Sequence, residues 1–201
     1  MYTLSLDTAT DSISVAVLDG KNIKGQNYRV MERGQGEALI PMIQDVIASS
    51  GVAMSDIGQV AVSVGPGSFT GVRIGLATAR GIGLALNIPV LGVSTLESMA
   101  FQKPGTVMVA IDTKRGDFYT QIFKDGKSLE EPTTRTIEQI KALAPASITG
   151  NGLSALEGTA THIEEQQDCL AAQVGLCALE HSLEPEPIYL READVTYQRT
   201  N

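Results

Sequence analysis

A glycine-rich segment between residues 65 and 86 constrains the fold more than any other part of the sequence. It follows the apolar stretch Gln59–Val64, starts as the turn Gly65–Gly71 and continues as an apolar, helix-like pattern. Four small residues, which we call the small-residue stripe, recur there at a spacing of four and share one helix face: Gly71, Gly75, Ala79 and Gly83. Because each glycine inside a helix costs about 1 kcal/mol relative to alanine, the stripe predicts that another helix packs closely against it.

The sequence leaves two arrangements of this stripe open. It could pack inside its own lobe, or it could face outward as a docking surface, and the two are compatible. In the outward arrangement, the residues that face the sheet are Val72, Leu76, Leu84 and Leu86. Arg73 and Arg80 are seven residues apart and therefore lie on one side of the helix, where they could frame a contact or bind an anion.

The turn before this helix also has two interpretations. Backbone N–H groups at a helix N-terminus can bind phosphate. A Walker motif, however, would need Lys and Ser or Thr after its last glycine, and here Gly71 is followed by Val72 and Arg73. We therefore favour a tight strand-to-helix turn over a phosphate-binding loop.

Composition narrows the function classes. The chain has 201 residues and a net charge of −8, which argues against nucleic acid as a direct, high-affinity partner. Its longest apolar run is interrupted by Arg73 and Arg80, so we expect no membrane span. Cys169 and Cys177 lie eight apart in an expected helix, too far for a disulfide, which makes the cytoplasm the expected location.

Hydrophobic periodicity predicts a first lobe over residues 1–103. It starts as a three-stranded antiparallel meander, Tyr2–Leu6, Ile13–Leu18 and Ile23–Val30. An amphipathic helix with Leu39 and Ile43 on its apolar face follows and ends at Gly51. The remaining expected elements are the strand Gln59–Val64, the glycine-rich helix, the strand Pro89–Val93 and a helix from Ser94 through Phe101.

A second, smaller lobe with a C-terminal tail is predicted over residues 104–201. It begins like the first, because Ser5–Thr8 and Ala110–Thr113 each end a strand with Asp-Thr before a turn and a returning strand. After Phe123 the pattern weakens. The expected elements there are the helices Ile137–Leu143 and Leu170–His181, the strand Ala146–Thr149, and a stiff connector at Glu184–Pro187 that leads to Ile188–Arg191.

The repeated hairpins favour the two-lobed α/β fold of actin, the sugar kinases and Hsp70, in which each lobe is a mixed sheet with helices. Several motifs narrow the resemblance to one family. They are Asp7–Thr10, Gly65–Gly75, Gly92–Leu96, Ala110–Asp112 and Pro187–Arg191. On these residues the chain resembles the TsaB (YeaZ) family from end to end, although the segment Glu32–Glu37, including Arg33, departs from the basic segment typical of that family.

The resemblance implies a function and a set of partners. TsaB proteins are non-catalytic paralogues of TsaD, the subunit that transfers a threonylcarbamoyl group to an adenosine beside the anticodon of tRNA. We therefore expect a heterodimer with TsaD, TsaE in a larger complex, a homodimer when the chain is alone, and tRNA contact only through the complex. The expected partner interface comprises Leu39, Ile43, Gly71, Arg73, Gly75, Ala79, Arg80 and Gly83.

The expected ligands are weaker inferences. No cofactor is expected to bind tightly, and the candidates are ATP or ADP with magnesium at a shared interface. The residues that could contact a nucleotide are Asp7, Thr8 and Asp112, although Asx turns explain Asp7 and Asp112 better. The rival function is a free-standing ATP-dependent kinase or hydrolase of the same fold.

No catalytic or metal-binding residue is expected. Where the resemblance places the metal-binding histidines of TsaD, this chain has Thr95 and Met99. His162 and His181, the only histidines, are nineteen residues apart, and we expect both at the surface. A protease interpretation therefore lacks a nucleophile and base pair.

Overall fold

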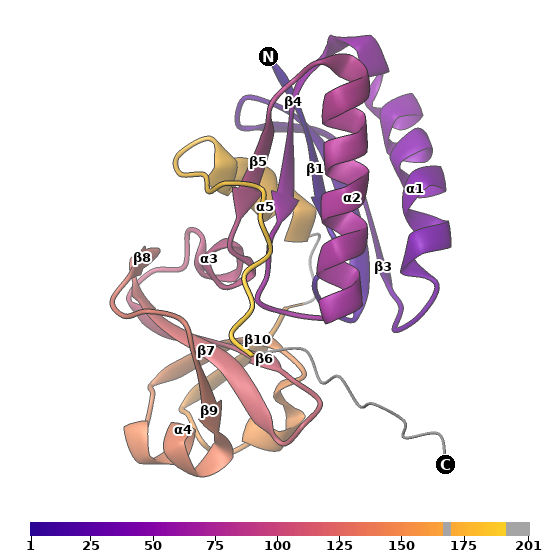
Figure 1. The fold of residues 1–201 in the computed structure, drawn as a ribbon. Coiled ribbons are helices and arrows are strands. Elements are labelled where there is room, and N and C mark those ends of the chain that lie inside the picture. The colour runs from indigo at the N-terminus through magenta and orange to yellow at the C-terminus, as the bar shows by residue number, and fades with distance from the viewer. Residues whose placement is uncertain (167–169, 192–201) are drawn as a thin grey trace, which may run out of the picture.

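The computed structural model describes residues 1–166 and 170–191, which form two mixed β-sheets with helices (Figure 1). The first sheet has the order β3-β2-β1-β4-β5. Its strands are β1 (Tyr2–Asp7), β2 (Ser12–Asp19), β3 (Asn22–Val30), β4 (Ile57–Ser63) and β5 (Val90–Val93). The first three form the expected antiparallel meander, and β4 and β5 are parallel to β1.

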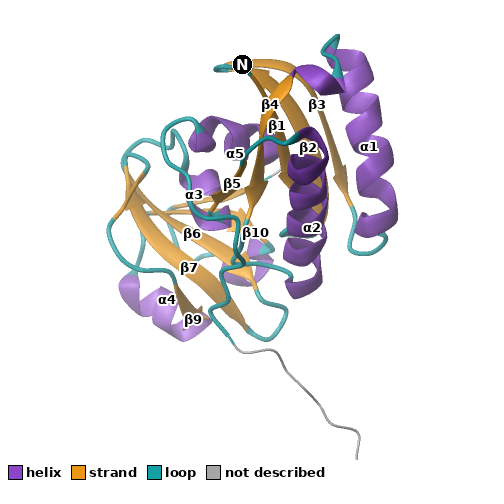
Figure 2. Ribbon diagram, turned by 45° about the horizontal axis from the view of Figure 1, so that its top comes forward, coloured by secondary structure: helices purple, strands orange, loops and turns teal. Residues whose placement is uncertain are grey.

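Alternation along β1 assigns its residues to the two faces of this sheet. Leu4 and Leu6 lie in the core that the sheet forms with α1 (Gln35–Ser50) and α2 (Phe69–Leu86). Ser5 faces the other way, toward α5 (Leu170–Ala178). The sheet is therefore covered by helices on both faces, and Figures 1 and 2 show α1 and α2 side by side on one of them.

The second sheet has the order β11-β10-β6-β7-β8, with β9 paired to β7. Its strands are β6 (Thr106–Asp112), β7 (Asp117–Lys124), β8 (Lys127–Ser128), β9 (Thr133–Thr136), β10 (Ser147–Asn151) and β11 (His162–Glu165). The other helical elements are α3 (Thr95–Ala100), α4 (Ile137–Leu143) and two 3₁₀ turns at Met54–Asp56 and Leu153–Leu156. β8, β9 and β11 escaped the sequence analysis because strands of two to four residues carry little periodicity.

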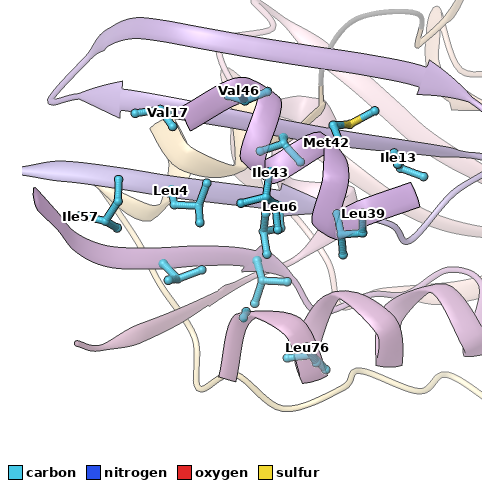
Figure 3. Close-up of a cluster of buried hydrophobic side chains, with 14 of the residues drawn as sticks. Leu4, Leu6, Ile13, Val17, Leu39, Met42, Ile43, Val46, Ile57 and Leu76 are labelled. Carbon is cyan, nitrogen blue, oxygen red and sulfur yellow. The ribbon is translucent and has the colours of Figure 1, made fainter. Parts of the chain in front are cut away.

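The main core lies between the first sheet and the helices α1 and α2 (Figure 3). Leu39 and Ile43 of α1 are buried in it, so their expected place in a partner interface is wrong. Burying such a side chain stabilises a fold by roughly 1.5–3 kcal/mol, and both side chains here are buried against the first sheet. The apolar stripe of α1 is thus fully occupied inside the molecule, which leaves its opposite side for contacts with other molecules.

Helix α5 corrects the expected division of the chain. The sequence analysis assigned residues 104–201 to the second lobe, but α5 packs on the first sheet. The hydroxyl of Ser14 in β2 accepts a hydrogen bond of 2.9 Å from the backbone N–H of Ala171 at the start of α5. A Cβ on Gly175 would lie 2.5 Å from Leu18, which shows how closely the helix approaches the strands.

Helix ends agree with the sequence signals in most cases. Gly51 ends α1 in the left-handed conformation, and Ser94 caps α3 through its hydroxyl. α5 ends at Ala178 rather than at the expected His181. Cys169, and with it the expected spacing of the cysteines, lies outside the described residues. Over the part of the chain that the structure describes, no helix has the length and apolar character needed to cross a membrane.

Candidate functional site: the interlobe cleft and the α1–α2 surface

A cleft of about 230 Å³ lies where loops of the two sheets meet. The loop after β1 contributes Ala9, Thr10 and Asp11, and the turn before α2 contributes residues 67–69. The second sheet contributes Asp112 and residues 113–115 of its first hairpin, together with Tyr119 and Asn151. The two Asp-Thr hairpins that the sequence analysis matched therefore do face one cleft.

Asp7 lies beneath this cleft and does not line it. Its side chain is fully buried, and its Oδ1 accepts hydrogen bonds from the Ser63 hydroxyl at 2.5 Å and from the Ala9 N–H at 3.2 Å. Its Oδ2 has no hydrogen-bond partner among the described residues. Burial raises the pKa of Asp7 to about 6, against the lowering effect of these two bonds. The expected nucleotide contact at Asp7 is wrong for this conformation, because no part of the side chain reaches the surface.

Thr8 is also buried, and its partner is the glycine turn. Its hydroxyl donates a hydrogen bond of 2.6 Å to the carbonyl of Gly71, so it is not available to a ligand as expected. A Cβ on Gly71 would overlap the carbonyl oxygen of Thr8, and one on Gly67 would overlap that of Ala9. The glycines thus allow the turn to rest directly on the β1–β2 loop, which confirms the tight turn.

The remaining members of the small-residue stripe also face inward. A Cβ on Gly75 would lie 2.6 Å from the Thr8 hydroxyl, and one on Gly83 would lie 2.5 Å from Val90. Ala79 is fully buried. The outward arrangement of the stripe is therefore wrong, because its close neighbours are the first lobe's own strands and the loop after β1. Among the described residues, none of the atoms nearest to a Cβ on Gly71, Gly75 or Gly83 belongs to another helix.

Asp112 reaches the cleft, where its charge is balanced by Lys114. The Lys114 N–H donates to its Oδ1 at 2.8 Å, and the Lys114 ammonium lies 3.6 Å from its Oδ2. The same ammonium lies 2.8 Å from a carboxylate oxygen of Asp11 on the opposite loop. This contact with Asp11 is the main reason that the pKa of Lys114 is raised. One lysine thus links carboxylates from both sides of the cleft.

The residues considered for a metal site, two aligned positions and the two histidines, lie in the interior or on distant surfaces. Thr95 is fully buried, and Met99 belongs to the core between the sheets. His162 is exposed on β11, and exposed His181 lies 3.2 Å from a Glu97 carboxylate oxygen. A search of the described residues finds no group of three or more His, Cys, Asp and Glu side chains that could hold a metal ion.

The helices α1 and α2 lie side by side, and each has exposed residues on the side that faces away from the sheet. We call this side the α1–α2 surface and define it by Ile40, Pro41, Gln44, Ala77, Gly81 and Leu84. Leu84 is 86% exposed, and a Cβ on Gly81 would meet nothing within 4 Å. Sequence reasoning missed this surface, although Ala77 and Gly81 repeat the spacing of four that characterises the inward stripe.

Arg73 and Arg80 lie on the exposed side of α2, as expected. The guanidinium of Arg73 lies 3.7 Å from the centre of the Phe69 ring, and its Nε donates to the Tyr189 hydroxyl at 2.8 Å. Arg80 donates to the backbone carbonyl of Pro185. Neither arginine pairs with a carboxylate among the described residues, and both hold the C-terminal segment against α2.

Comparison with known proteins identifies the family. The family model described as "TsaD: tRNA N6-adenosine threonylcarbamoyltransferase" matches residues 24–191. The chain is 40% identical over 124 residues to the Escherichia coli tRNA threonylcarbamoyladenosine biosynthesis protein TsaB, covering 59% of this chain and 53% of that protein. The chain belongs to the TsaD family, in its TsaB (YeaZ) branch. TsaB of Bacillus subtilis is 28% identical over 134 residues, 65% of this chain and 58% of that protein.

Solved structures extend the likeness over nearly the whole chain. YeaZ from Pseudomonas aeruginosa superposes with a TM-score of 0.77 at 26% identity, covering 94% of this chain and 99% of that one. Component A of the (R)-2-hydroxyglutaryl-CoA dehydratase of Acidaminococcus fermentans has a TM-score of 0.55 at 12% identity, over 90% of this chain and 98% of that one. A hexokinase of Thermus thermophilus has a TM-score of 0.52 at 12% identity, over 89% and 98%. These two distant likenesses confirm the expected actin-like, sugar-kinase-like fold. In the sequence comparisons, this TsaB-family chain spans about half the length of the curated relatives it matches.

Proposed function

We propose that this chain is a non-catalytic subunit of the tRNA threonylcarbamoyladenosine transferase, and that it binds TsaD and supports its activity. Family membership supplies the pathway, because the E. coli and B. subtilis relatives are named for threonylcarbamoyladenosine biosynthesis. The match to the TsaD family model supports a common origin of the two subunits. Paralogous chains present similar surfaces, so a surface that pairs two copies can also pair the two paralogues.

The α1–α2 surface is the observation that carries the proposal. Contiguous apolar surface with charged residues around it marks interaction sites on soluble proteins. Here Leu84, Ala77 and Gly81 are exposed on α2, and Ile40 is exposed on the neighbouring helix α1. Small side chains at the centre of such a surface let helices of a partner approach closely. The proposed interface therefore keeps Arg73 and Arg80 from the sequence analysis and replaces its buried members with these exposed ones.

The cleft supports an accessory role over a catalytic one. Two of the three side chains expected to contact a nucleotide are buried, and the third, Asp112, is paired with Lys114. An ATP or ADP molecule with magnesium at an interface shared with TsaD stays a prediction, with no cofactor bound tightly to this chain alone. Such a ligand would have to displace the Lys114 ammonium that links Asp11 to Asp112, or bind to it.

The further partners follow from the same assignment. TsaE is proposed to join in a larger cytoplasmic complex, and the chain alone is proposed to form a homodimer through the α1–α2 surface. The net charge of −8 favours tRNA binding only through the complex. Filter binding of tRNA to the chain alone should therefore be weak and steeply dependent on salt, and tight binding at physiological salt would contradict this assignment.

Leu84→Asp tests the proposed contact. A charge introduced into an apolar interface should weaken binding to purified TsaD at least about tenfold, since one unpaired buried charge exceeds 1.4 kcal/mol. Leu129→Asp is the matched control, because Leu129 is an exposed leucine (59%) on the second lobe. Sedimentation velocity with TsaD would compare them. Equal binding by the two variants would place the interface elsewhere.

A free-standing ATP-dependent kinase or hydrolase remains the second candidate, because the two hairpins do enclose a cleft of about 230 Å³. The discriminating measurement is ATP turnover by the purified chain without TsaD. The accessory function predicts none above background. Turnover that disappears on Asp112→Asn replacement would establish the rival function.

A further inference from the structure

We propose that residues Leu183–Arg191 form a strap that ties the first sheet and α2 to the cleft loop of the second sheet, and thereby fixes the width of the cleft. This inference concerns the chain's own conformation and does not depend on the partner proposed above. In Figure 1 the strap is the yellow segment that follows α5, runs down beside β5 and ends near β6 and β7. Three sets of contacts along its length carry the argument.

The first contacts attach the strap to the edge of the first sheet. Leu183 and Gly92 of β5 exchange two backbone hydrogen bonds of 2.8 Å, and the Ile188 N–H donates to the Val64 carbonyl at 2.7 Å. A Cβ on Gly92 would lie 2.5 Å from the Glu184 carbonyl oxygen, so glycine is what allows the strap to lie this close. β5 is the last strand of its sheet, and the strap therefore covers part of an otherwise open edge.

The second contacts attach the strap to α2. Arg80 bonds the Pro185 carbonyl, and Arg73 bonds the Tyr189 hydroxyl. The rings of Tyr189 and Phe69 lie 5.3 Å apart, with the Arg73 guanidinium over Phe69. Phe69 also lines the cleft, so the end of the strap packs directly behind one cleft wall.

The last contact reaches the other wall. Arg191 pairs with one carboxylate oxygen of Asp117, and the Thr113 hydroxyl donates to the other. Thr113 belongs to the hairpin loop that lines the cleft. The strap thus holds Phe69 on one side of the cleft and the residue that anchors the opposite loop on the other. Pro185 and Pro187 reduce the backbone freedom lost when the strap docks.

Hydrogen exchange on a double variant tests the strap. Tyr189→Ala with Arg191→Ala removes the ring contact and the ion pair, and we expect amides of residues 113–117 to exchange about tenfold faster. Amides of β1 and β2 should keep their rates. The conservative pair Tyr189→Phe with Arg191→Lys should stay close to wild type. Lys21→Ala, which breaks the exposed Lys21–Glu180 ion pair, is the matched control and should leave residues 113–117 unchanged.

A distance measurement completes the test. Spin labels at Ser55→Cys and Lys141→Cys report the separation of the lobes in a Cys169→Ser background, with the sample diluted in unlabelled protein. The thiol of Cys177 is buried, and this burial raises its pKa, so it should stay unlabelled. The double alanine variant should broaden the distance distribution. If neither the exchange rates nor the distance change in the double alanine variant, the strap proposal is overturned. It is also overturned if exchange in β1 and β2 rises as much as in residues 113–117, because the segment would then only stabilise the whole fold.

Discussion

At the scale of single residues, the glycines on the two sides of α2 have opposite surroundings. Gly71 has the Thr8 carbonyl where a side chain would begin, whereas Gly81 has open space. Gly71→Ala should therefore lower the free energy of unfolding by about 1–3 kcal/mol, as overpacking does. Gly81→Ala should raise it by up to about 1 kcal/mol through helix propensity. Urea unfolding of both variants checks this, and equal effects would contradict the inward orientation of the stripe.

Asp7 should make stability fall as pH rises through mildly acidic values. Its pKa is about 6 in the folded protein, well above the ordinary aspartate value of 3.8. The unfolded chain thus loses its proton first, and stability declines between about pH 4 and 6 and levels off above the folded pKa. A pKa change of this size corresponds to roughly 3 kcal/mol. Asp7→Asn should remove this contribution, so urea unfolding curves of the two proteins should diverge over that range. Parallel pH profiles would show that Asp7 is not buried in this way.

Residue-level prediction from the sequence succeeded where chemistry is local. The Gly65–Gly71 turn was predictable from its glycines, and the structure shows what each one allows: Gly67 and Gly71 lie against the β1–β2 loop, and Gly65 has a positive φ. The orientation of the stripe was not predictable, because Ala77, Gly81 and Ala85 repeat the same spacing two residues further on. Both faces of α2 carry small side chains, and only the packing of the helix on the sheet decides which face is buried. For the same reason the burial of Asp7 and Thr8 depended on the position of α2.

At the scale of elements, α5 is the part whose place the sequence did not reveal. Its helical pattern was recognised, but its contact with β2 joins residues 157 positions apart, Ser14 and Ala171. No local signal encodes such a pairing. The boundary of the lobes was consequently drawn too simply, since the chain returns from the second sheet to the first before it ends.

Close packing of α5 gives a prediction at this scale. Gly175 lies against Leu18 and Ser5, so Gly175→Leu should push the helix off the sheet and cost about 3 kcal/mol, the upper end for overpacking. Ala48→Leu, on the exposed side of α1, is the matched control. Thermal melting should separate them clearly. A melting temperature unchanged in Gly175→Leu would show that α5 does not pack on the sheet as described.

At the scale of the whole molecule, two sheets, a cleft and a two-helix surface are arranged so that each can serve a different contact. The two-lobed fold was predictable from the repeated Asp-Thr hairpins at Asp7 and Asp112, because each follows a buried strand at the same point. The cleft's charge pattern was not, since it depends on Lys114 reaching Asp11 from the other lobe. The sequence analysis also placed the exposed Leu84 on the sheet side, because tertiary packing sets the rotation of a helix about its axis and the sequence of α2 does not.

The central claim is that this chain acts through TsaD and not by its own catalysis. The most direct measurement is threonylcarbamoyl transfer to tRNA, reconstituted from purified TsaD of the same organism, its further partners and a threonylcarbamoyl donor, with this chain added or omitted. The account predicts that transfer requires the wild-type chain, that Leu84→Asp reduces it at least about tenfold, and that Leu129→Asp does not. Transfer by this chain without TsaD, or full activity when the chain is omitted, would contradict it.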